Sequence, residues 1–261
     1  MAKTIKIFDL TGSPTGEMTL PEIFDTPVRP DVISRAVNAI QSQRFQPQGR
    51  DPLAGKRTTA ESRGVGLGIS RIPRIKGPSQ RAALAPGTVG GRQPHPPTSQ
   101  KRVVKNIPKK EKRLALFSAI AATASREVVS SRGHRTRDVP QIPLIVANQL
   151  EELKKTKKVE ETLINLGSWE DLYRVKGSRK IRAGKGKRRG RKSKEAIGPL
   201  IVVAENKGIV RAARNIPGVE AVIVDNLNSE ILAPGSHPGR LTIWTENAVK
   251  RLTELYEKEE K

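Results

Sequence analysis

Apolar and polar residues alternate at the start of the chain, and the pattern then changes to a helical period. Residues 4–8 alternate and predict a strand, which is closed by Asp9. Pro30 marks the start of a helix, because its fixed backbone angle suits the first helical turn. The turn-forming residues between the two patterns are Gly12, Ser13, Pro14 and Gly16. The apolar face of the helix consists of Val32, Ile33, Ala36, Val37 and Ile40.

A second helical pattern begins near Asn106 and Pro108 and ends at Gly133. The alanines in this pattern would let a sheet or another helix approach closely. We therefore assign the helix to the hydrophobic core and find no cofactor-binding pattern in it. Its apolar stripe at helical spacing consists of Leu114, Phe117, Ala121, Ala124 and Val128.

Four short apolar runs have the continuous pattern of strands that are buried on both faces. They occupy residues 143–147, 200–204, 221–224 and 241–244. Helical patterns separate several of these runs, and such alternation is typical of right-handed βαβ crossovers. We predict an α/β fold, built as a single Rossmann-like parallel sheet with helices covering both faces.

The helices predicted around these strands have recognisable boundaries. One ends at Gly167, and the next begins with residues 168–171, where a Ser and an acid three positions later resemble a capping box. A short helix is expected at residues 209–214, and Thr245 is expected to cap the last helix. The inward face of that last helix consists of Ala248, Val249, Leu252, Leu255 and Tyr256.

The interval between the first two helical patterns, residues 46–105, has no sustained helical or strand period. Gly and Pro recur in it, aromatic residues are absent, and its acids are Asp51 and Glu61. Such a segment cannot bury enough apolar surface to offset its ordering entropy. Because phosphates pair with Arg and Lys, a bound polyanion would order it. The candidate binding residues are Arg50, Lys56, Arg57, Arg63, Arg71, Arg74, Lys76, Arg81, Arg92, Lys101 and Arg102.

A solvated linker between two domains is the alternative interpretation of this interval. However, the helical patterns at its two ends are incomplete as separate domains. We therefore predict one α/β domain over residues 1–261, with 46–105 inserted in it as an extended loop.

A second basic tract covers residues 176–194 and contains eleven Lys or Arg and no acid. Its glycines would let the backbone lie close to a phosphate backbone. We expect the tract to repel itself and stay mobile in the unbound protein and to contact RNA directly. A localisation signal or a merely solvated run is the alternative. The candidate binding residues are Arg179, Lys180, Arg182, Lys185, Lys187, Arg188, Arg189 and Arg191.

Composition narrows the class of protein. The chain has 261 residues, a formal net charge of +23 and a pI of about 10.7, which is the charge balance of a nucleic-acid-binding protein. Aromatic residues make up 3%, which disfavours base stacking and favours contacts to phosphates and RNA shape. Cysteine is absent, so disulfides and thiol catalysis are excluded. No apolar run suits a membrane helix or a signal peptide, and we expect a cytoplasmic protein without membrane contact.

Motifs for catalysis or cofactor binding are weak. Residues 64–68 resemble a fragment of a dinucleotide loop, but they neither follow a strand nor open a helix. Residues 184–187 lack the spacing of a phosphate-binding loop. Residues 206–208 could bind an anion at a helix N-terminus, although an ordinary turn explains them as well. We predict no cofactor.

The histidines and the acids at strand ends leave one further possibility. His95, His134 and His237 are far apart, show no metal-ligand spacing, and are expected in loops or at the surface. We predict no metal site. Three acids follow predicted strands, where open sheets gather active sites, but capping and turns explain them equally. These acids are Asp9, Glu205 and Asp225.

Taken in order, these parts resemble the universal L-four family of large-subunit ribosomal proteins, in its archaeal and eukaryotic branch and most like its archaeal members. The resemblance covers essentially the whole chain. Its most specific segments are GTVGGRQPHPP, within residues 46–105, and RKIRAGKGKRRGR, within residues 176–194. The ending IVVAENKGIVRAARNIPGVEAVIVDNLN fits the same family.

The resemblance implies a structural protein of the large ribosomal subunit and no enzymatic activity. It implies that residues 46–105 penetrate 23S-type ribosomal RNA (rRNA) and that residues 176–194 bind it as well. The loop tip, between Arg63 and Arg92, would help to line the exit tunnel for the nascent peptide. The implied partners are large-subunit rRNA, neighbouring ribosomal proteins and the nascent peptide near the tip.

Two other functions fit a basic α/β protein. An RNA-modifying or RNA-processing enzyme would need a pocket with convergent titratable groups near the strand-end acids. A regulator that binds RNA or the chromosome would need only the basic segments. The residues alone do not separate these alternatives from the ribosomal one.

Overall fold

The computed structural model describes residues 3–260, with side chains up to residue 256. The chain divides into two units. We call Met1–Ile40 with Asn106–Lys261 the α/β unit, and Gln41–Lys105 the loop unit. The loop unit coincides closely with the inserted loop expected at residues 46–105. The grouping of both units into one domain stays a prediction.

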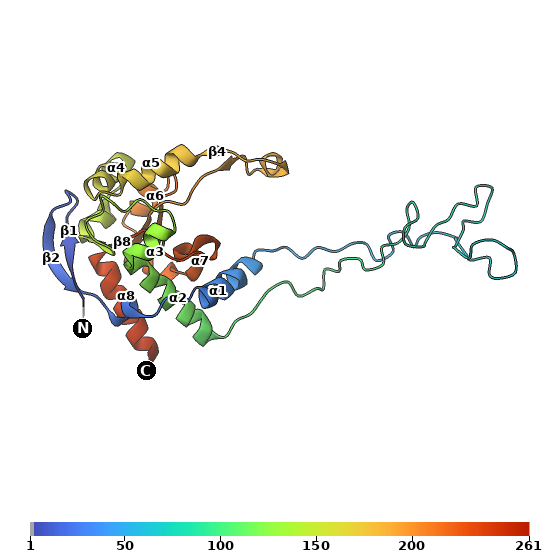
Figure 1. The fold of residues 1–261 in the computed structure, drawn as a ribbon, viewed down its shortest axis with the longest axis horizontal. Helices are drawn as coiled ribbons and strands as arrows, with labels where there is room; N and C mark the ends of the chain where they lie inside the picture. The colour runs from blue at the N-terminus through green and yellow to red at the C-terminus, as the bar shows by residue number, and fades with distance from the viewer. Residues whose placement is uncertain (1–2, 261) are drawn as a thin grey trace. The chain divides into compact units, whose positions relative to one another are not determined.

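A sheet forms the centre of the α/β unit (Figure 1). It has six strands in the order β2-β1-β3-β8-β6-β7. All five predicted strands are present, as β1, β3, β6, β7 and β8. All pairs between β1, β3, β8, β6 and β7 are parallel. The strands are β1 (Thr4–Phe8), β2 (Pro14–Thr19), β3 (Leu144–Val146), β6 (Leu200–Val203), β7 (Glu220–Ile223) and β8 (Thr242–Thr245).

The central strands are buried on both faces, as their continuous apolar runs predict. In β6, Leu200 and Val202 pack into one apolar cluster, and Ile201 and Val203 pack into the other. This division follows from the two-residue period of a strand. Helices α4 (Thr156–Asn165), α5 (Trp169–Ser178) and α6 (Ile209–Ala213) cover the Ile201 face. Helices α1 (Pro30–Ser42), α2 (Lys109–Ala124), α7 (Ser229–Leu232) and α8 (Glu246–Glu260) cover the Leu200 face.

The sheet is mixed, and the prediction of a wholly parallel, Rossmann-like sheet is wrong in this respect. Pro14 and Gly16 lie in the edge strand β2, which pairs antiparallel with β1, where we predicted only a turn. Strand β2 is polar and mostly exposed, so it has no apolar period to detect. Pro14 is its first residue, one of the few strand positions that tolerate proline. The parallel strands also follow an order other than that of dinucleotide-binding folds.

The helix predicted from Pro108 to Gly133 is interrupted. Helix α2 ends at Ala124, and α3 (Arg126–Ser131) begins after Ser125, whose backbone is extended. The second half of α2 is buried on several sides, so its buried residues do not form the single predicted stripe. Phe117 from that stripe contacts Tyr256 of α8 edge-on, with ring centroids 4.7 Å apart.

The two predicted caps have different outcomes. The hydroxyl of Thr245 accepts a hydrogen bond from the Ala248 amide at 3.3 Å, so Thr245 caps α8 as expected. The hydroxyl of Ser168 instead donates to the Leu163 carbonyl at 2.9 Å and makes no cap hydrogen bond to α5. The predicted capping box is therefore wrong. Its acid, Asp171, is buried in the polar network described below.

Residues 43–108, all of which the structure describes, contain turns, bends and isolated bridges but no helix or strand (Figure 1). Within the loop unit, two limbs approach each other where the Arg50 amide donates to the Pro97 carbonyl at 3.0 Å. Further along, Arg74 forms bridges with Glu61 and Ala82. The unit is thus held by the hydrogen bonds of its turns and bridges, without a sizeable core.

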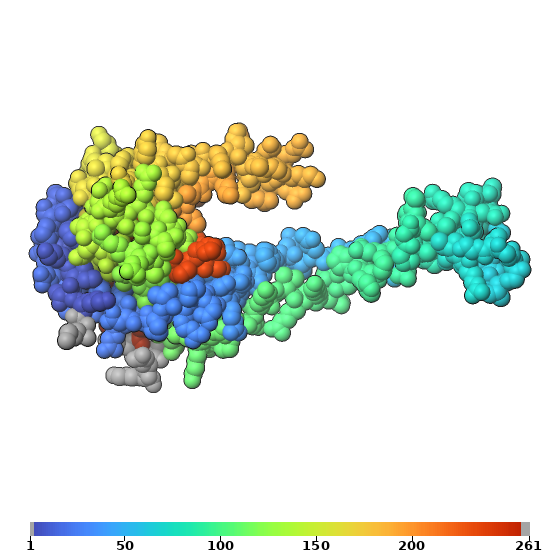
Figure 2. Space-filling view, in the orientation of Figure 1, coloured from blue at the N-terminus to red at the C-terminus, as the bar shows by residue number. Residues whose placement is uncertain are grey.

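The tract at residues 176–194 contains local secondary structure, and its mobility in the unbound protein stays a prediction. Lys176 belongs to the last turn of α5. Strands β4 (Lys180–Ile181) and β5 (Ser193–Lys194) then pair antiparallel around a 3-10 turn at Lys185–Arg189. We call residues 179–195 the basic hairpin. It stands out from the surface of the α/β unit (Figure 2).

No helix in the described part of the chain has the length and apolar character that crossing a membrane requires.

Candidate nucleic-acid interface

Most of the predicted cations in the loop unit point into solvent. Arg74 and Arg92 are half-buried, and the other predicted residues from Arg50 to Arg102 are exposed. Three of the exposed cations lie close in sequence to the two bridges of the loop unit: Arg63, Arg71 and Arg81. The arrangement leaves charged side chains available for phosphates.

Several cations of the loop unit have an internal role. The two acids of the predicted loop are each paired, Asp51 with Arg57 and Glu61 with Lys76 at 2.9 Å. The Leu53 amide and the Arg57 guanidinium donate to Asp51 and lower the pKa of its carboxyl group. Arg74 donates to the carbonyl of Gln80 at 3.1 Å. These contacts shape the turns that present the remaining cations.

Glycines allow the loop unit to pack against itself. A side chain at Gly55 would place its Cβ 2.4 Å from the Gly91 carbonyl oxygen, and Gly55 also has a positive φ of 75°. Only glycine fits such a contact without displacing the backbone.

Residues 64–68 carry exposed apolar side chains between glycines. Val65 and Leu67 are 70% and 60% exposed, and Val89 is 79% exposed. Residues 65–69 form a bend with no strand before it and no helix after it, so residues 64–68 are not a strand-to-helix junction. The dinucleotide-loop interpretation therefore finds no structural support there. An exposed apolar group in a charged segment is suited to contact another molecule.

The basic hairpin presents most of its predicted cations to solvent, with Arg182 as the exception. The Arg182 amide donates to the Lys192 carbonyl at 2.8 Å, and its guanidinium donates to the Arg191 carbonyl at 3.1 Å. Arg182 thus joins the two sides of the hairpin. The remaining predicted cations of the hairpin are exposed: Arg179, Lys180, Lys185, Lys187, Arg188, Arg189 and Arg191.

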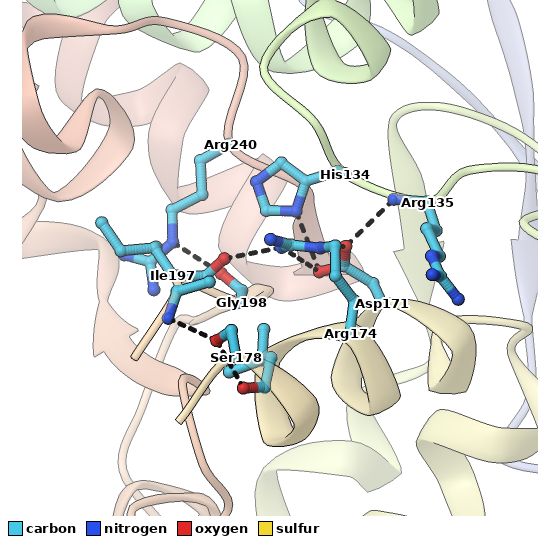
Figure 3. Close-up of polar contacts among 10 residues, drawn as sticks. His134, Arg135, Asp171, Arg174, Ser178, Ile197, Gly198 and Arg240 are labelled. Carbon is cyan, nitrogen blue, oxygen red and sulfur yellow. Dashed lines mark hydrogen bonds and ion pairs between the residues drawn. The ribbon is translucent and has the colours of Figure 1, made fainter. Parts of the chain in front are cut away.

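A buried polar network fixes the hairpin's root to the α/β unit (Figure 3). Arg174 donates to both carboxylate oxygens of Asp171, at 2.9 and 3.3 Å, and to the Ile197 carbonyl at 2.8 Å. Ser178 accepts from the Ala196 amide at 2.8 Å. These bonds tie α5, before the hairpin, to the chain that follows it.

His134 belongs to the same network, which the sequence analysis missed. It is buried, although we expected a loop or surface histidine, and its Nδ1 lies 2.9 Å from an Asp171 oxygen. Burial lowers the pKa of His134 despite that hydrogen bond. Burial raises the pKa of Asp171, but hydrogen bonds from His134, Arg174 and the Arg135 amide outweigh it and lower it overall. No motif joins residues 134 and 171, so only proximity in space could reveal this pair.

Two of the three strand-end acids pair with nearby cations, and the backbone of the third, Asp9, bonds to Ser13 and Gly12 in a turn. Glu205 pairs with Lys207 at 4.0 Å, and Asp225 pairs with Arg251 at 3.5 Å. The buried carboxylate at this edge is Glu151, which accepts from the Ala204 amide and the Thr245 hydroxyl at 3.0 and 2.7 Å. Its partners give it a structural role.

Two smaller expectations concern turns and metals. The Asn206 side chain accepts from the Gly208 amide at 3.2 Å, which is the ordinary turn we favoured over an anion site. Among the described residues, no three His, Cys, Asp or Glu side chains are grouped to hold a metal ion. His95 and His237 are both exposed.

Together, the fold and charge distribution define a basic α/β protein of the nucleic-acid-binding class, with cations gathered on two segments outside its core. The family model described as "Ribosomal protein L4/L1 family" matches residues 18–255. The chain belongs to this family.

Relatives support the assignment over nearly the full chain. The "Large ribosomal subunit protein uL4" of Methanosphaera stadtmanae is 50% identical over 258 residues, which is 99% of this chain and 99% of that protein. The protein of the same name from Saccharolobus islandicus is 49% identical over 257 residues, which is 98% of this chain and 96% of that protein. The recognition made from the residues is confirmed.

Proposed function

We propose that this chain is a structural constituent of the large ribosomal subunit and that it acts by binding rRNA. The observation that carries the proposal is the similarity over almost the whole chain to proteins named for that subunit. The exposed cations of the loop unit and the basic hairpin supply the physical means. Its partners are then large-subunit rRNA and neighbouring ribosomal proteins.

The two basic segments divide the binding task. The hairpin is a compact ordered projection, so it meets a preformed RNA surface with little loss of entropy. The loop unit lacks a sizeable core and gains order from the RNA as its Arg and Lys side chains neutralise phosphates. Arginines add bidentate hydrogen bonds to phosphate oxygens, which set orientation as well as affinity.

The loop unit penetrates the rRNA, and its tip helps to line the exit tunnel. Supporting this role, Val65, Leu67 and Val89 are exposed apolar side chains between small residues. A tunnel wall must offer surfaces that do not bind a passing peptide strongly. Small and isolated apolar groups suit that need better than a run of cations.

Enzymatic function is the weaker alternative. An RNA-modifying enzyme would need convergent titratable groups, whereas Glu205 and Asp225 pair with neighbouring cations and Glu151 is consumed by structural hydrogen bonds. The family assignment also favours a structural protein.

Sedimentation of a native cell lysate through gradients at low and high salt tests the proposal. A protein threaded through folded RNA is expected to remain with the large subunit, at near-stoichiometric level, as salt rises. A regulator or enzyme bound mainly by surface charge is expected to dissociate. A known salt-labile RNA-binding protein in the same lysate serves as the control. Release of this chain to the top of the high-salt gradient would refute the structural role.

A further inference from the structure

An open groove of roughly 590 Å³ lies on the α/β unit near the amino ends of β6 and β8. Open α/β sheets place their catalytic sites at the opposite, carboxyl ends of the strands. The groove is therefore separate from the strand-end acids considered above. Its walls include Val128, Arg132, His134, Arg174, Ile197 and His237.

Among the described residues, no carboxylate pairs with Arg132 in this groove. Its Nη2 donates to the Pro234 carbonyl at 2.9 Å, whereas its Nη1 is buried and has no hydrogen-bond partner among the described residues. Burial, with repulsion from Arg240 and Arg174, lowers the pKa of Arg132 to about 10. A buried, unpaired guanidinium N–H costs folding free energy. Turning this side chain toward an anion in the groove would give the unpaired N–H an acceptor and relieve that cost.

The other two arginines nearby are already neutralised. Asp171 pairs with Arg174, and Glu220 accepts from Arg240 at 2.6 Å. Glu195 at the groove's wall faces Arg179 at 4.0 Å, so it does not pair with Arg132. The positive charge of Arg132 is thus not balanced by any of these carboxylates.

The network behind the groove holds Arg174 in place. Its Nε and Nη2 are occupied by Asp171 and Ile197, while its side chain remains 25% exposed. His134 lines the groove without adding charge to it. Its lowered pKa keeps it neutral near pH 7, and its Nδ1–H donates to Asp171. The other ring nitrogen points away from Asp171 (Figure 3). The rigid backing means that an anion would meet an Arg174 already oriented.

The groove is continuous with the basic hairpin along the chain. Arg174 precedes the hairpin in α5, Glu195 is its last residue, and residues 196–197 lead from it toward β6. An RNA strand that follows the exposed cations of the hairpin would reach the groove at its root. This continuity favours a phosphate of an RNA backbone over a small metabolite.

We propose that this groove binds one backbone phosphate of RNA at the root of the basic hairpin, through the guanidinium groups of Arg132 and Arg174. The inference rests on the proposed rRNA-binding function and adds a site on the α/β unit to it. A residue that is costly in the unbound protein and useful in the complex is typical of a binding site.

The test compares full-length wild type with Arg132→Gln and with the control Arg211→Gln, which removes an exposed charge on α6. Binding of a large-subunit rRNA transcript is measured across a series of KCl concentrations, with an unrelated RNA of equal length as the specificity control. We expect Arg132→Gln to weaken binding about tenfold and to reduce the salt slope by about one. The Tm of unbound Arg132→Gln should not fall.

Each other outcome has a distinct meaning. Wild-type affinity and slope in Arg132→Gln would overturn the groove site and leave the proposed function standing. Equal binding of rRNA and unrelated RNA by the wild type would overturn the proposed function itself. Inorganic phosphate is titrated at constant ionic strength in parallel: a rise in wild-type Tm without any effect of Arg132 on RNA binding would assign the groove to free phosphate and refute the RNA site.

A second substitution protects the test against misfolding. If Arg132→Gln does not fold, Arg132→Lys retains the charge but loses the planar fork. This variant should keep the salt slope and lose part of the affinity. Unchanged affinity in a folded Arg132→Lys would contradict bidentate phosphate binding.

Discussion

The α/β unit and the loop unit differ in what holds their chain in one conformation. In the α/β unit, two apolar clusters bury both faces of the sheet, and residues such as Ile145 and Trp244 are fully buried. In the loop unit, few side chains are buried, and the hydrogen bonds of turns and bridges, together with close glycine contacts, shape the chain. The comparison teaches that one unit derives its stability from apolar burial, whereas the other has no such core, which is why we propose that bound RNA supplies most of its order.

The largest expected effect comes from the centre of the sheet. Trp244→Ala removes a fully buried side chain that contacts Phe24 edge-on, with centroids 5.5 Å apart. We expect it to lower the free energy of unfolding by about 3–5 kcal/mol, measured by chemical denaturation. The matched control is Val89→Ala in the loop unit, where the side chain is exposed, and we expect a change within about 0.5 kcal/mol. Equal losses would contradict the comparison.

Deletion of residues 63–92 tests the other side of the comparison. The six Lys and Arg in this range would be lost together, and we expect the affinity for large-subunit rRNA to fall by about 10²–10³-fold at low salt. The patterned core lies outside the deletion, so cooperative thermal unfolding should persist. Loss of cooperative unfolding, followed by circular dichroism, would show that the α/β unit needs the loop unit to fold.

Asp171 allows the polar network to be separated from the apolar core. In Asp171→Asn, the charge that neutralises Arg174 and accepts from His134 is lost. We expect the free energy of unfolding to fall by about 2–3 kcal/mol, because the remaining groups stay buried. The control Asp51→Asn changes a paired but exposed carboxylate of the loop unit, and its denaturation midpoint should match the wild type. An unchanged free energy of unfolding in Asp171→Asn would mean that the network adds no stability.

The smallest effect concerns acid sensitivity of the same network. His134 has a folded pKa below its ordinary value of 6.5, so its contribution to stability is present above pH 6.5 and is lost as pH falls through the folded pKa. One proton changes the free energy of unfolding by at most about 1.4 kcal/mol per pH unit. We expect His134→Gln to flatten the stability profile between pH 7 and 5.5, whereas the exposed control His95→Gln should not. Identical profiles would exclude His134 as the source.

Asp171 adds to this sensitivity at lower pH. Its folded pKa also lies below the ordinary value of 3.8, so its contribution is present above pH 3.8 and is lost below it. The two groups therefore act in the same direction but in separate pH windows. A profile that continues to fall below pH 4 in His134→Gln, and less steeply in Asp171→Asn, would assign them individually.

The parts of the fold that were predictable are those with a local period. The parallel strands, the start of α1 at Pro30 and the cap at Thr245 all follow from spacing and from the chemistry of single residues. Strand β2 escaped because an exposed edge strand has no apolar face, and its order comes from hydrogen bonds to β1. The break at Ser125 follows from its extended backbone, and the cap at Ser168 fails because its hydroxyl bonds the Leu163 carbonyl at the end of the preceding helix; residue type and spacing indicate neither.

The candidate interface was predictable to a similar degree. Charge density marked residues 46–105 and 176–194 as polyanion-binding segments. It did not show that Arg182 would serve the hairpin internally or that Arg132, outside both segments, would stand at a groove. Both facts depend on which groups lie nearby in space.

The amino-acid sequence by itself determined the α/β class, the two basic segments and the family, because periodicity, charge and motif order are properties of neighbouring residues. Tertiary structure alone decided the antiparallel edge strand, the burial of His134 against Asp171 and the unpaired charge of Arg132. The physical reason is that desolvation and pairing depend on the groups that folding brings together from distant positions. A charged side chain therefore acquires its energetic role only when its neighbours are in place.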